Sequence, residues 1–285
     1  MKKALLWMFV VAAMLTACDQ LTTVKKQLGG DEKASQVSQD TIATKLVGRH
    51  VVDSTGTYAI NLAFPSGKKT PLTSAIVEFF SEQLGGTFEG DYADSAAMLS
   101  YYINKVVNEY HATCEGNSDW QDWQILFQDS TSVIKSADTD DFVTYLLTRE
   151  VYSGGAHGSF IISGQTFRKA DGRRIGWEVF PLSYDEGFQE LLKKGLMSYW
   201  DVETPEELQD FILDKSNYYY VPLPQCAPLF KTDGVEFIYN QYEIAAYAAG
   251  LPSFTVPYEE LLPYMNVTGR RLVEKVTNQD RNAEN

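Results

Sequence analysis

The residue types best suited to chemistry stand in one short stretch, Tyr152 to Gly158, which reads Tyr-Ser-Gly-Gly-Ala-His-Gly. Its glycines, Gly154, Gly155 and Gly158, allow positive φ angles or a close approach of neighbouring backbone. The imidazole of His157 among them can act as a general base, a metal ligand or a pH switch. The same pattern suits a tight connection between two strands, with the histidine hydrogen-bonded locally. Because no second histidine, cysteine pair or acidic cluster lies nearby in the sequence, we favour this structural interpretation.

A hydrolytic role for His157 would need a carboxylate partner. The sequence offers Glu150, just before the stretch, and Glu243, far beyond it. General acid–base catalysis needs such groups within about 3 Å of each other, which the sequence does not establish. Cys114 and Cys226 lack the spacing of a zinc site, so we expect no metal and no other cofactor. Whether these two cysteines form a disulfide stays open, because the sequence does not fix the distance between their Cα atoms.

The start of the chain has the features of a targeting signal. Lys2 and Lys3 precede an uninterrupted apolar run, Ala4 to Leu15, which is too short for a membrane-spanning helix of about 20 residues. The run ends in Leu-Thr-Ala-Cys, the pattern of a bacterial lipobox. We therefore predict a signal peptide over residues 1–17 and acylation of Cys18, against the alternative of an ordinary signal peptide with a chance cysteine. The lipid would attach the chain to a membrane and place it in the cell envelope, outside the cytoplasm.

The net charge limits which classes of binding partner are expected. The formal net charge of the 285-residue chain is −14, and loss of the leader would remove two further lysines. Nucleic acid binding is disfavoured by this sign, because phosphate neutralisation needs a basic surface. An acidic surface suits solubility or the steering of a basic partner. The residues from Asp19 to about Thr44 are polar without apolar periodicity, so we interpret 18–50 as a tether between lipid and body.

The remaining residues alternate between helical and strand-like patterns. Helical spacing of apolar residues and start signals predict helices over 72–84, 98–110, 185–199 and 204–212. Alternation and Asp-Gly turns predict strands over 58–64, 123–127, 142–151, 160–162 and around 167–175 and 230–239. We therefore expect an α+β fold of antiparallel sheets with helices packed on them, and a flexible tail over 267–285.

Three stretches resemble a known family in order and spacing: Tyr152–Gly158, then Phe167–Ile175 with Val179-Phe180, and Phe237–Gly250 with Phe254–Tyr258. They are similar to the extracytoplasmic domain of unknown function shared by RsiV-type anti-sigma factors and PdaC-type peptidoglycan deacetylases. The resemblance implies two α/β sub-units in one body, a PdaC-like unit over 51–165 and an RsiV-like unit over 166–266. The second unit has been compared with the heat-shock-cognate ATPase fold, but this sequence contains no phosphate loop.

The resemblance limits what function can be expected. RsiV binds lysozyme through this domain, and PdaC deacetylates glycan strands with a separate metal-dependent domain. We find no sigma-binding segment, membrane helix or deacetylase domain in the sequence, so we expect neither of those roles. The expected function is a stand-alone, non-catalytic lipoprotein that binds a basic lysozyme-like protein or peptidoglycan, with a hydrolase using His157 as the alternative. The candidate ligand-binding or structural residues are Tyr152, Gly154, Gly155, His157, Gly158, Tyr242 and Glu243.

Overall fold

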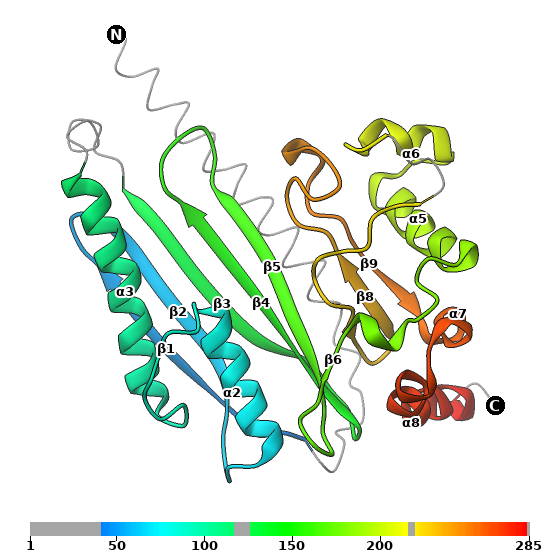
Figure 1. Ribbon diagram of the computed structural model, residues 1–285, viewed down its shortest axis with the longest axis horizontal. Coiled ribbons are helices and arrows are strands. Elements are labelled where there is room, and N and C mark those ends of the chain that lie inside the picture. Colours follow the sequence, from blue (N-terminus) through cyan, green and yellow to red (C-terminus); the bar gives the residue numbers. More distant parts are fainter. Residues whose placement is uncertain (1–40, 117–125, 216–219, 284–285) are drawn as a thin grey trace. The chain divides into compact units, whose positions relative to one another are not determined.

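A computed structural model of the chain describes residues 41–116, 126–215 and 220–283. The expected class is confirmed: the fold is α+β, with a six-stranded sheet, a three-stranded sheet and helices around both (Figure 1). In chain order the first sheet comprises β1 (Thr44–Val52), β2 (Gly56–Pro65), β3 (Phe127–Asp138), β4 (Phe142–Tyr152), β5 (Ser159–Arg168) and β6 (Arg174–Ile175). No helix among the described residues is long and apolar enough to cross a membrane.

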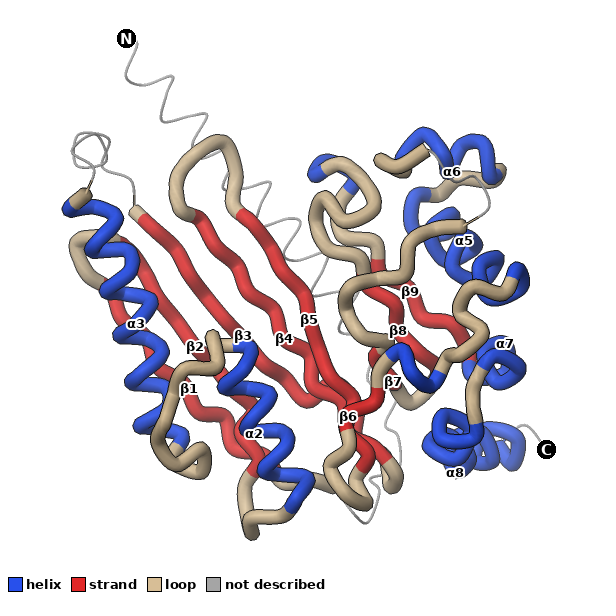
Figure 2. Tube along the Cα trace, in the orientation of Figure 1, coloured by secondary structure: helices blue, strands red, loops and turns tan. Residues whose placement is uncertain are grey.

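The strands of the large sheet follow chain order from β1 to β6 (Figure 2). Every neighbouring pair is antiparallel except β2 and β3, which run parallel. That pair departs from the antiparallel sheets predicted from the sequence. The reason lies in the connection, because a long crossover with two helices carries the chain back to the starting end of β2. These helices are α2 (Pro71–Gln83) and α3 (Ser95–Glu115).

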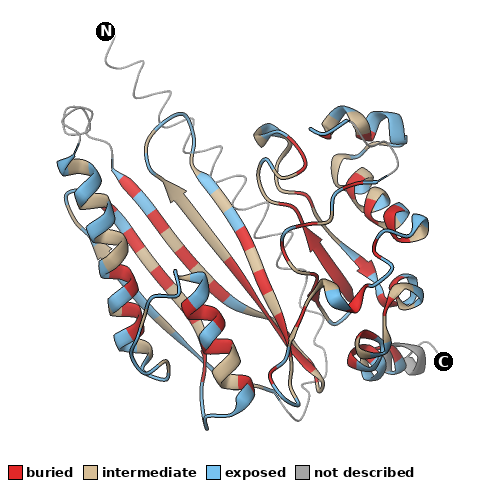
Figure 3. Cartoon of the chain, in the orientation of Figure 1, coloured by how far each residue is buried: buried red, intermediate tan, exposed pale blue. Residues whose placement is uncertain are grey.

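Helices α2 and α3 cover one face of the large sheet, and their buried residues meet those of the strands (Figure 3). Strand β2 alternates buried and partly exposed residues, as expected for a strand with one covered face. Helix α2 begins at an N-cap, Thr70, whose side chain accepts a hydrogen bond from the Thr73 amide, with Pro71 in the first turn. Phe80 of α2 packs edge-on against Tyr145 of β4, with ring centroids 5.3 Å apart.

The C-terminal part has its own small sheet and its own apolar cluster. Its elements are α5 (Glu186–Trp200), α6 (Pro205–Phe211), β7 (Leu229–Phe230), β8 (Gly234–Ile238), β9 (Ser253–Pro257), α7 (Tyr258–Leu261) and α8 (Val267–Ala283), with single 3₁₀ turns at Trp177–Val179, Tyr247–Ala249 and Leu262–Tyr264. Phe188, Phe230 and Phe237 are fully or almost fully buried there.

The two parts are joined through buried hydroxyl groups. Thr144 of β4 donates to the carbonyl of Phe230 at 2.6 Å, and the amide of Phe230 donates to the hydroxyl of Thr166 at 3.0 Å. Thr166 belongs to β5, so the unit boundary predicted at 165–166 falls inside a strand. The large sheet in fact continues through β6, and the chain turns to the second cluster only after it.

Two predicted segment ends are wrong. Strand β1 begins at Thr44, inside the stretch predicted as tether to residue 50, because its polar residues pair with β2 along the full strand. Residues 267–283 form α8 instead of a flexible tail. This helix is polar overall, yet it buries Leu272 and Val273, and the Asn266 side chain accepts a hydrogen bond from the Gly269 amide at its start.

Candidate functional site

The distinctive glycine–histidine stretch forms the loop of the hairpin between β4 and β5. Gly154 and Gly155 have φ angles of 93° and 95°, which side-chain-bearing residues rarely adopt, so the predicted need for glycine is confirmed. The predicted crowding is wrong at Gly155, where a Cβ atom would meet nothing within 4 Å. The tight position is Gly158, whose Cβ would lie 2.9 Å from the carbonyl oxygen of Val151. The hydroxyl of Tyr152 closes the loop by donating to the Gly155 carbonyl at 3.2 Å.

His157 is exposed and lies against an aromatic ring from far along the chain. Its imidazole stacks on Tyr247, with ring centroids 3.8 Å apart and planes at 24°. His157 Nδ1 lies 3.0 Å from the Gly158 carbonyl oxygen, and the Tyr247 hydroxyl donates to that same oxygen at 3.2 Å. The expected local hydrogen bond is therefore present, although the imidazole itself is exposed and rests on Tyr247.

Tyr242 extends the aromatic surface. Its ring centroid lies 5.9 Å from that of Tyr247, and 58% of the residue is exposed. Tyr242 has a φ of 62°, and it shares positive φ with only one other non-glycine among the described residues, Asp201. We call the exposed His157 and Tyr242, together with the half-buried Tyr247 between them, the aromatic cluster. It unites two of the three stretches that carried the family resemblance.

Side-chain amides tie these two stretches together. The Asn240 side chain accepts from the Ile162 amide at 2.7 Å and donates to the Ile162 carbonyl at 2.9 Å. The Gln241 side chain accepts from the Phe160 amide at 3.0 Å. These two side chains bond to the edge of β5 as a neighbouring strand would. They thereby satisfy backbone groups of β5 that have no strand partner there. Asn240 and Gln241 were not selected from the sequence, although both stand in the quoted third stretch.

Glu243 supports the turn that presents Tyr242. One carboxylate oxygen accepts from the Asn240 amide at 2.7 Å and the other from the Gln225 amide at 2.5 Å. Burial, with the charge of Glu243 nearby, raises the pKa of the Tyr239 phenol far above its usual range, and Tyr239 donates to the Pro222 carbonyl. Glu243 thus acts on backbone groups and has no described contact with His157.

The remaining predicted partners fall elsewhere. Glu150 lies in β4 opposite Ser130 and Phe160, and its side chain makes no hydrogen bond or ion pair within the described ranges. Cys114 and Cys226 are both free thiols, so they do not form a disulfide. Cys18 lies outside the described residues. The described ranges contain no group of three or more histidine, cysteine or acidic residues placed to hold a metal.

Two open hollows lie away from the aromatic cluster. One, of about 460 Å³, lies between the end of β2, the start of α2 and the segment before α3, and includes Phe64, Lys69 and Phe88. The other, of about 500 Å³, includes Ile42, Arg168 and Arg271. Neither contains a residue selected from the sequence as a site.

Comparison with known proteins finds a family match over one segment of the chain. Residues 227–259 match the family model described as a protein of unknown function, DUF3298. The matched segment contains Asn240, Tyr242, Glu243 and Tyr247, and so includes the C-terminal half of the site. No curated protein matches the chain.

Two solved structures share the fold. The crystal structure of a DUF3298 family member from Bacteroides fragilis NCTC 9343 aligns with a TM-score of 0.66 at 21% identity, covering 80% of this chain and 96% of that one. A DUF3298 family protein from Pseudomonas aeruginosa PAO1 aligns with a TM-score of 0.52 at 15% identity and the same coverage. The architecture is therefore that of DUF3298 proteins, and neither name assigns an activity.

Proposed function

We propose that this chain is a non-catalytic envelope lipoprotein that binds a protein or glycan ligand through the aromatic cluster. The observation that carries the proposal is Tyr242, an exposed ring held on a left-handed backbone. That conformation costs a residue with a Cβ atom about 1–2 kcal/mol. Strain of this kind persists where surrounding bonds enforce it, and it concentrates at ligand sites. Here Glu243 and Asn240 enforce it from either side of the turn.

Aromatic rings suit both classes of ligand. A tyrosine offers a large apolar face and a hydroxyl at its tip, which favours protein interfaces and stacking on sugar rings. Tryptophans are the other side chains suited to stacking on sugars, but those that the structure describes are engaged elsewhere. Trp177 donates its indole N–H to the Pro224 carbonyl and Trp200 to the Ala249 carbonyl, and both pack on the second apolar cluster. Trp120 and Trp123 lie outside the described residues.

The net charge of −14 supports a cationic partner. Opposite charge speeds the encounter of two proteins and is weakened by salt. Lysozyme, a basic wall-active protein, is the partner suggested by the RsiV-like stretches. Peptidoglycan is the glycan suggested by the PdaC-like stretches.

The test is a binding assay with both ligands in parallel. Purified chain is titrated with lysozyme and, separately, sedimented with insoluble peptidoglycan. We expect Tyr242→Ala to weaken binding to one of them at least tenfold. Tyr184→Ala is the matched control, because Tyr184 is 65% exposed and lies outside the cluster. Equal affinity of wild type and Tyr242→Ala for both ligands would contradict the proposal.

The hydrolase alternative has its own assay. His157 lacks a carboxylate partner among the described residues, because Glu243 is engaged with backbone amides. We therefore expect no turnover of peptidoglycan, acetylated glycan or ester substrates. Turnover by the wild type that disappears in a folded His157→Ala protein would make the hydrolase the better proposal.

The lipid anchor is tested by metabolic labelling. Cells supplied with a tagged fatty acid should label the wild-type chain and leave Cys18→Ala unlabelled. Equal labelling of both chains would contradict acylation at this residue.

A further inference from the structure

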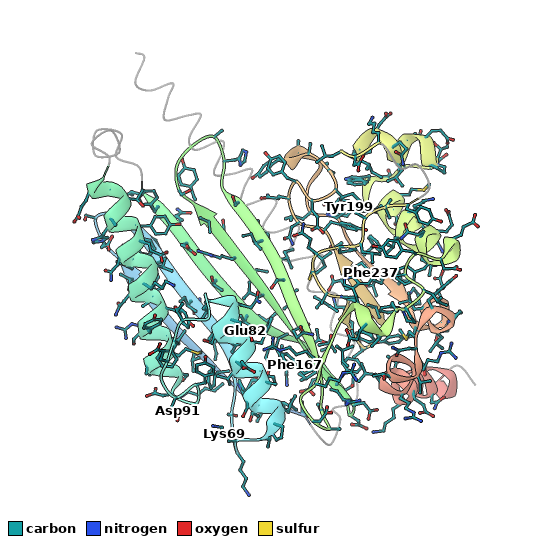
Figure 4. All side chains as sticks on the ribbon, viewed as in Figure 1. Lys69, Glu82, Asp91, Phe167, Tyr199 and Phe237 are labelled. Carbon is teal, nitrogen blue, oxygen red and sulfur yellow. The ribbon has the colours of Figure 1, made fainter. Side chains whose placement is uncertain are left out.

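The large sheet has one face covered by helices and another that is open over β1, β2, β3 and the end of β4. Tyr58, Ile60 and Leu62 of β2 point toward α2 and α3, and the residues between them point to the opposite face. Figure 4 views the molecule from the covered side, with α2 and its Glu82 in front of the strands. On the opposite face, the residues of β1–β3 that point outward are exposed or half-buried, and we call this surface the open face.

The C-terminal part covers the same side of the sheet only toward β5. Thr144 of β4 and Thr166 of β5 point to this side, and both bond to Phe230 of the small sheet. Farther along β4, Thr148 and Glu150 point the same way and are half-buried. The open face therefore begins where the contact with the C-terminal part ends, and it continues to the free edge of β1.

The open face carries little charge, although the chain is strongly acidic. Its outward residues are mostly small, hydroxyl-bearing or apolar, and only His50 of β1 and Glu150 of β4 are ionisable. Two apolar side chains are well exposed there, Leu46 at 75% and Ile134 at 47%. Copies of a chain with net charge −14 repel one another through most of their surface. A nearly neutral face with exposed apolar side chains is where two copies can meet with the least repulsion.

His50 and Glu150 stand at the two ends of one row across the sheet. The register places His50 beside Ala59 and Ala59 beside Ser130. Ser130 in turn lies beside Glu150. Because neighbouring strands are about 4.8 Å apart, three spacings separate His50 from Glu150 by about 14 Å within one chain. Neither side chain has a hydrogen bond or ion pair among the described residues. The two are placed symmetrically about the middle of the row, between β2 and β3.

We propose that the open face binds a second copy of this chain in a dimer whose two-fold axis runs along the strands, between β2 and β3. A two-fold interface brings the same surface of both copies together. With this axis β1 lies over the partner's β4, and β2 lies over the partner's β3. His50 then meets the partner's Glu150, and symmetry repeats the contact. A histidine can donate a hydrogen bond to a carboxylate whether it is neutral or charged.

The same axis matches the remaining positions of the open face. Asn61 and Ser132 are neighbours in the register, so Asn61 lies over the partner's Ser132 and can bond to it. Ala63 and Ile134 follow the last registered pair of β2 and β3, and they meet as an apolar pair. Two sheets stacked in this way lie about 10 Å apart with their strands aligned within about 30°. Polar groups thus meet polar groups, and apolar side chains meet apolar ones.

The arrangement leaves room for the rest of both chains. The partner's β5 and C-terminal part lie beyond the free edge of β1, where the large sheet has no further described strand. Because the axis runs along the strands, the loops between β4 and β5 of both copies lie at the same end of the dimer. Both aromatic clusters are then presented together, which favours a ligand with repeated binding sites.

The experiment measures self-association at neutral pH. Purified chain carrying Cys18→Ser is examined by sedimentation equilibrium at increasing concentration, with a reductant present because Cys114 is a free thiol. We expect a reversible equilibrium between monomer and dimer. His50→Glu should weaken dimerisation by about tenfold or more, because it places like charges opposite each other twice. Asn104→Glu is the matched control, since it adds a negative charge at an exposed position of α3, and it should dimerise like the parent.

A mixing experiment tests the pairing itself. Glu150→Lys should also weaken dimerisation, because the partner's His50 loses its acceptor. A mixture of His50→Glu with Glu150→Lys should dimerise better than either variant alone, since the introduced glutamate then faces the introduced lysine. Recovery on mixing also establishes that both variants are folded. A parent chain that stays monomeric would overturn the proposal, as would a dimer unaffected by His50→Glu, which would place the contact elsewhere, for example at the free edge of β1. Failure of the mixture to recover dimerisation would overturn the proposed axis.

Discussion

The imidazole of His157 lies nearly flat on the ring of Tyr247, with centroids 3.8 Å apart, although the two residues belong to different parts of the fold. His157 follows β4 in the large sheet, and Tyr247 follows β8 in the small one. The stack adds to the hydrogen bonds by which the side chains of Asn240 and Gln241 hold this segment against β5. An exposed histidine is thereby given a fixed position without a buried hydrogen-bond network.

Replacement of His157 should reveal a stacking contribution. We expect His157→Ala to lower the free energy of unfolding by about 0.5–1.5 kcal/mol, the range for aromatic pairs. His157→Phe keeps the stack but loses the hydrogen bond to the Gly158 carbonyl, and should retain most of the stability. Denaturant unfolding measures both. If Phe were as destabilising as Ala, the hydrogen bond and not the stack would be the main contribution.

A glycine variant is usually less stable than the alanine variant at the same position, and at Tyr242 we expect the opposite order. Because the φ angle is 62°, Tyr242→Gly relieves strain that Tyr242→Ala keeps. We expect the glycine variant to unfold with a free energy about 1 kcal/mol higher than that of the alanine variant. Tyr184 does not have a positive φ angle, so there we expect the alanine variant to be more stable than the glycine variant. An alanine variant as stable as the glycine variant at Tyr242 would show that the backbone relaxes there.

Much of the fold could be predicted from the sequence because its signals are local. Helical spacing placed α2, α3 and α5, and the Thr204-Pro205 start placed α6. Gly154 and Gly155 were recognised as positions that allow a positive φ angle, and both adopt one. Helix α8 was missed because its exposed face dominates its composition. The signals that remain are Asn266 at its start and the buried pair Leu272 and Val273.

The residues of the site could be predicted from the sequence, but their contacts could not. The quoted motifs contain Tyr242, Glu243 and His157, but which of them meet depends on pairing between distant segments. Ile162 bonds to Asn240, a contact across 78 positions of the chain. No local pattern distinguishes an asparagine that caps a sheet edge from one in a turn. The link between His157 and Glu243 that the hydrolase alternative needs is absent, since the carboxylate accepts hydrogen bonds from amides of its own turn and of Gln225.

The two thiols should differ sharply in reactivity. Burial, together with the charges of Glu236 and Glu243, raises the pKa of Cys226 to about 12, so almost no thiolate forms at neutral pH. Cys114 is only partly buried at the end of α3. In a Cys18→Ser chain we expect one thiol to react rapidly with Ellman's reagent at pH 8 and a second only after unfolding. Cys114→Ser should abolish the rapid reaction, whereas two equally fast thiols would contradict the buried position of Cys226.

The turn between β1 and β2 should make stability depend on acid. Asp53 Oδ1 accepts hydrogen bonds from the amides of Thr55 and Gly56 and from the Thr55 hydroxyl, and Oδ2 lies 2.9 Å from His111 Nε2. Burial alone would raise the pKa of Asp53, but these bonds outweigh it and lower the pKa from 3.8 to about 2.

A folded-state pKa below the unfolded one means that the unfolded chain binds the proton more readily. The stabilisation by Asp53 is therefore complete above about pH 4 and is lost as the pH falls through about 2. We expect Asp53→Asn to be less stable than wild type at pH 6, with the difference shrinking steadily between pH 4 and pH 2. Urea unfolding at several pH values measures this difference, and the comparison near pH 2 serves as the internal control. A difference that stays constant across that range would show that the charge of Asp53 contributes nothing, and that Asn disturbs only the shape of the turn.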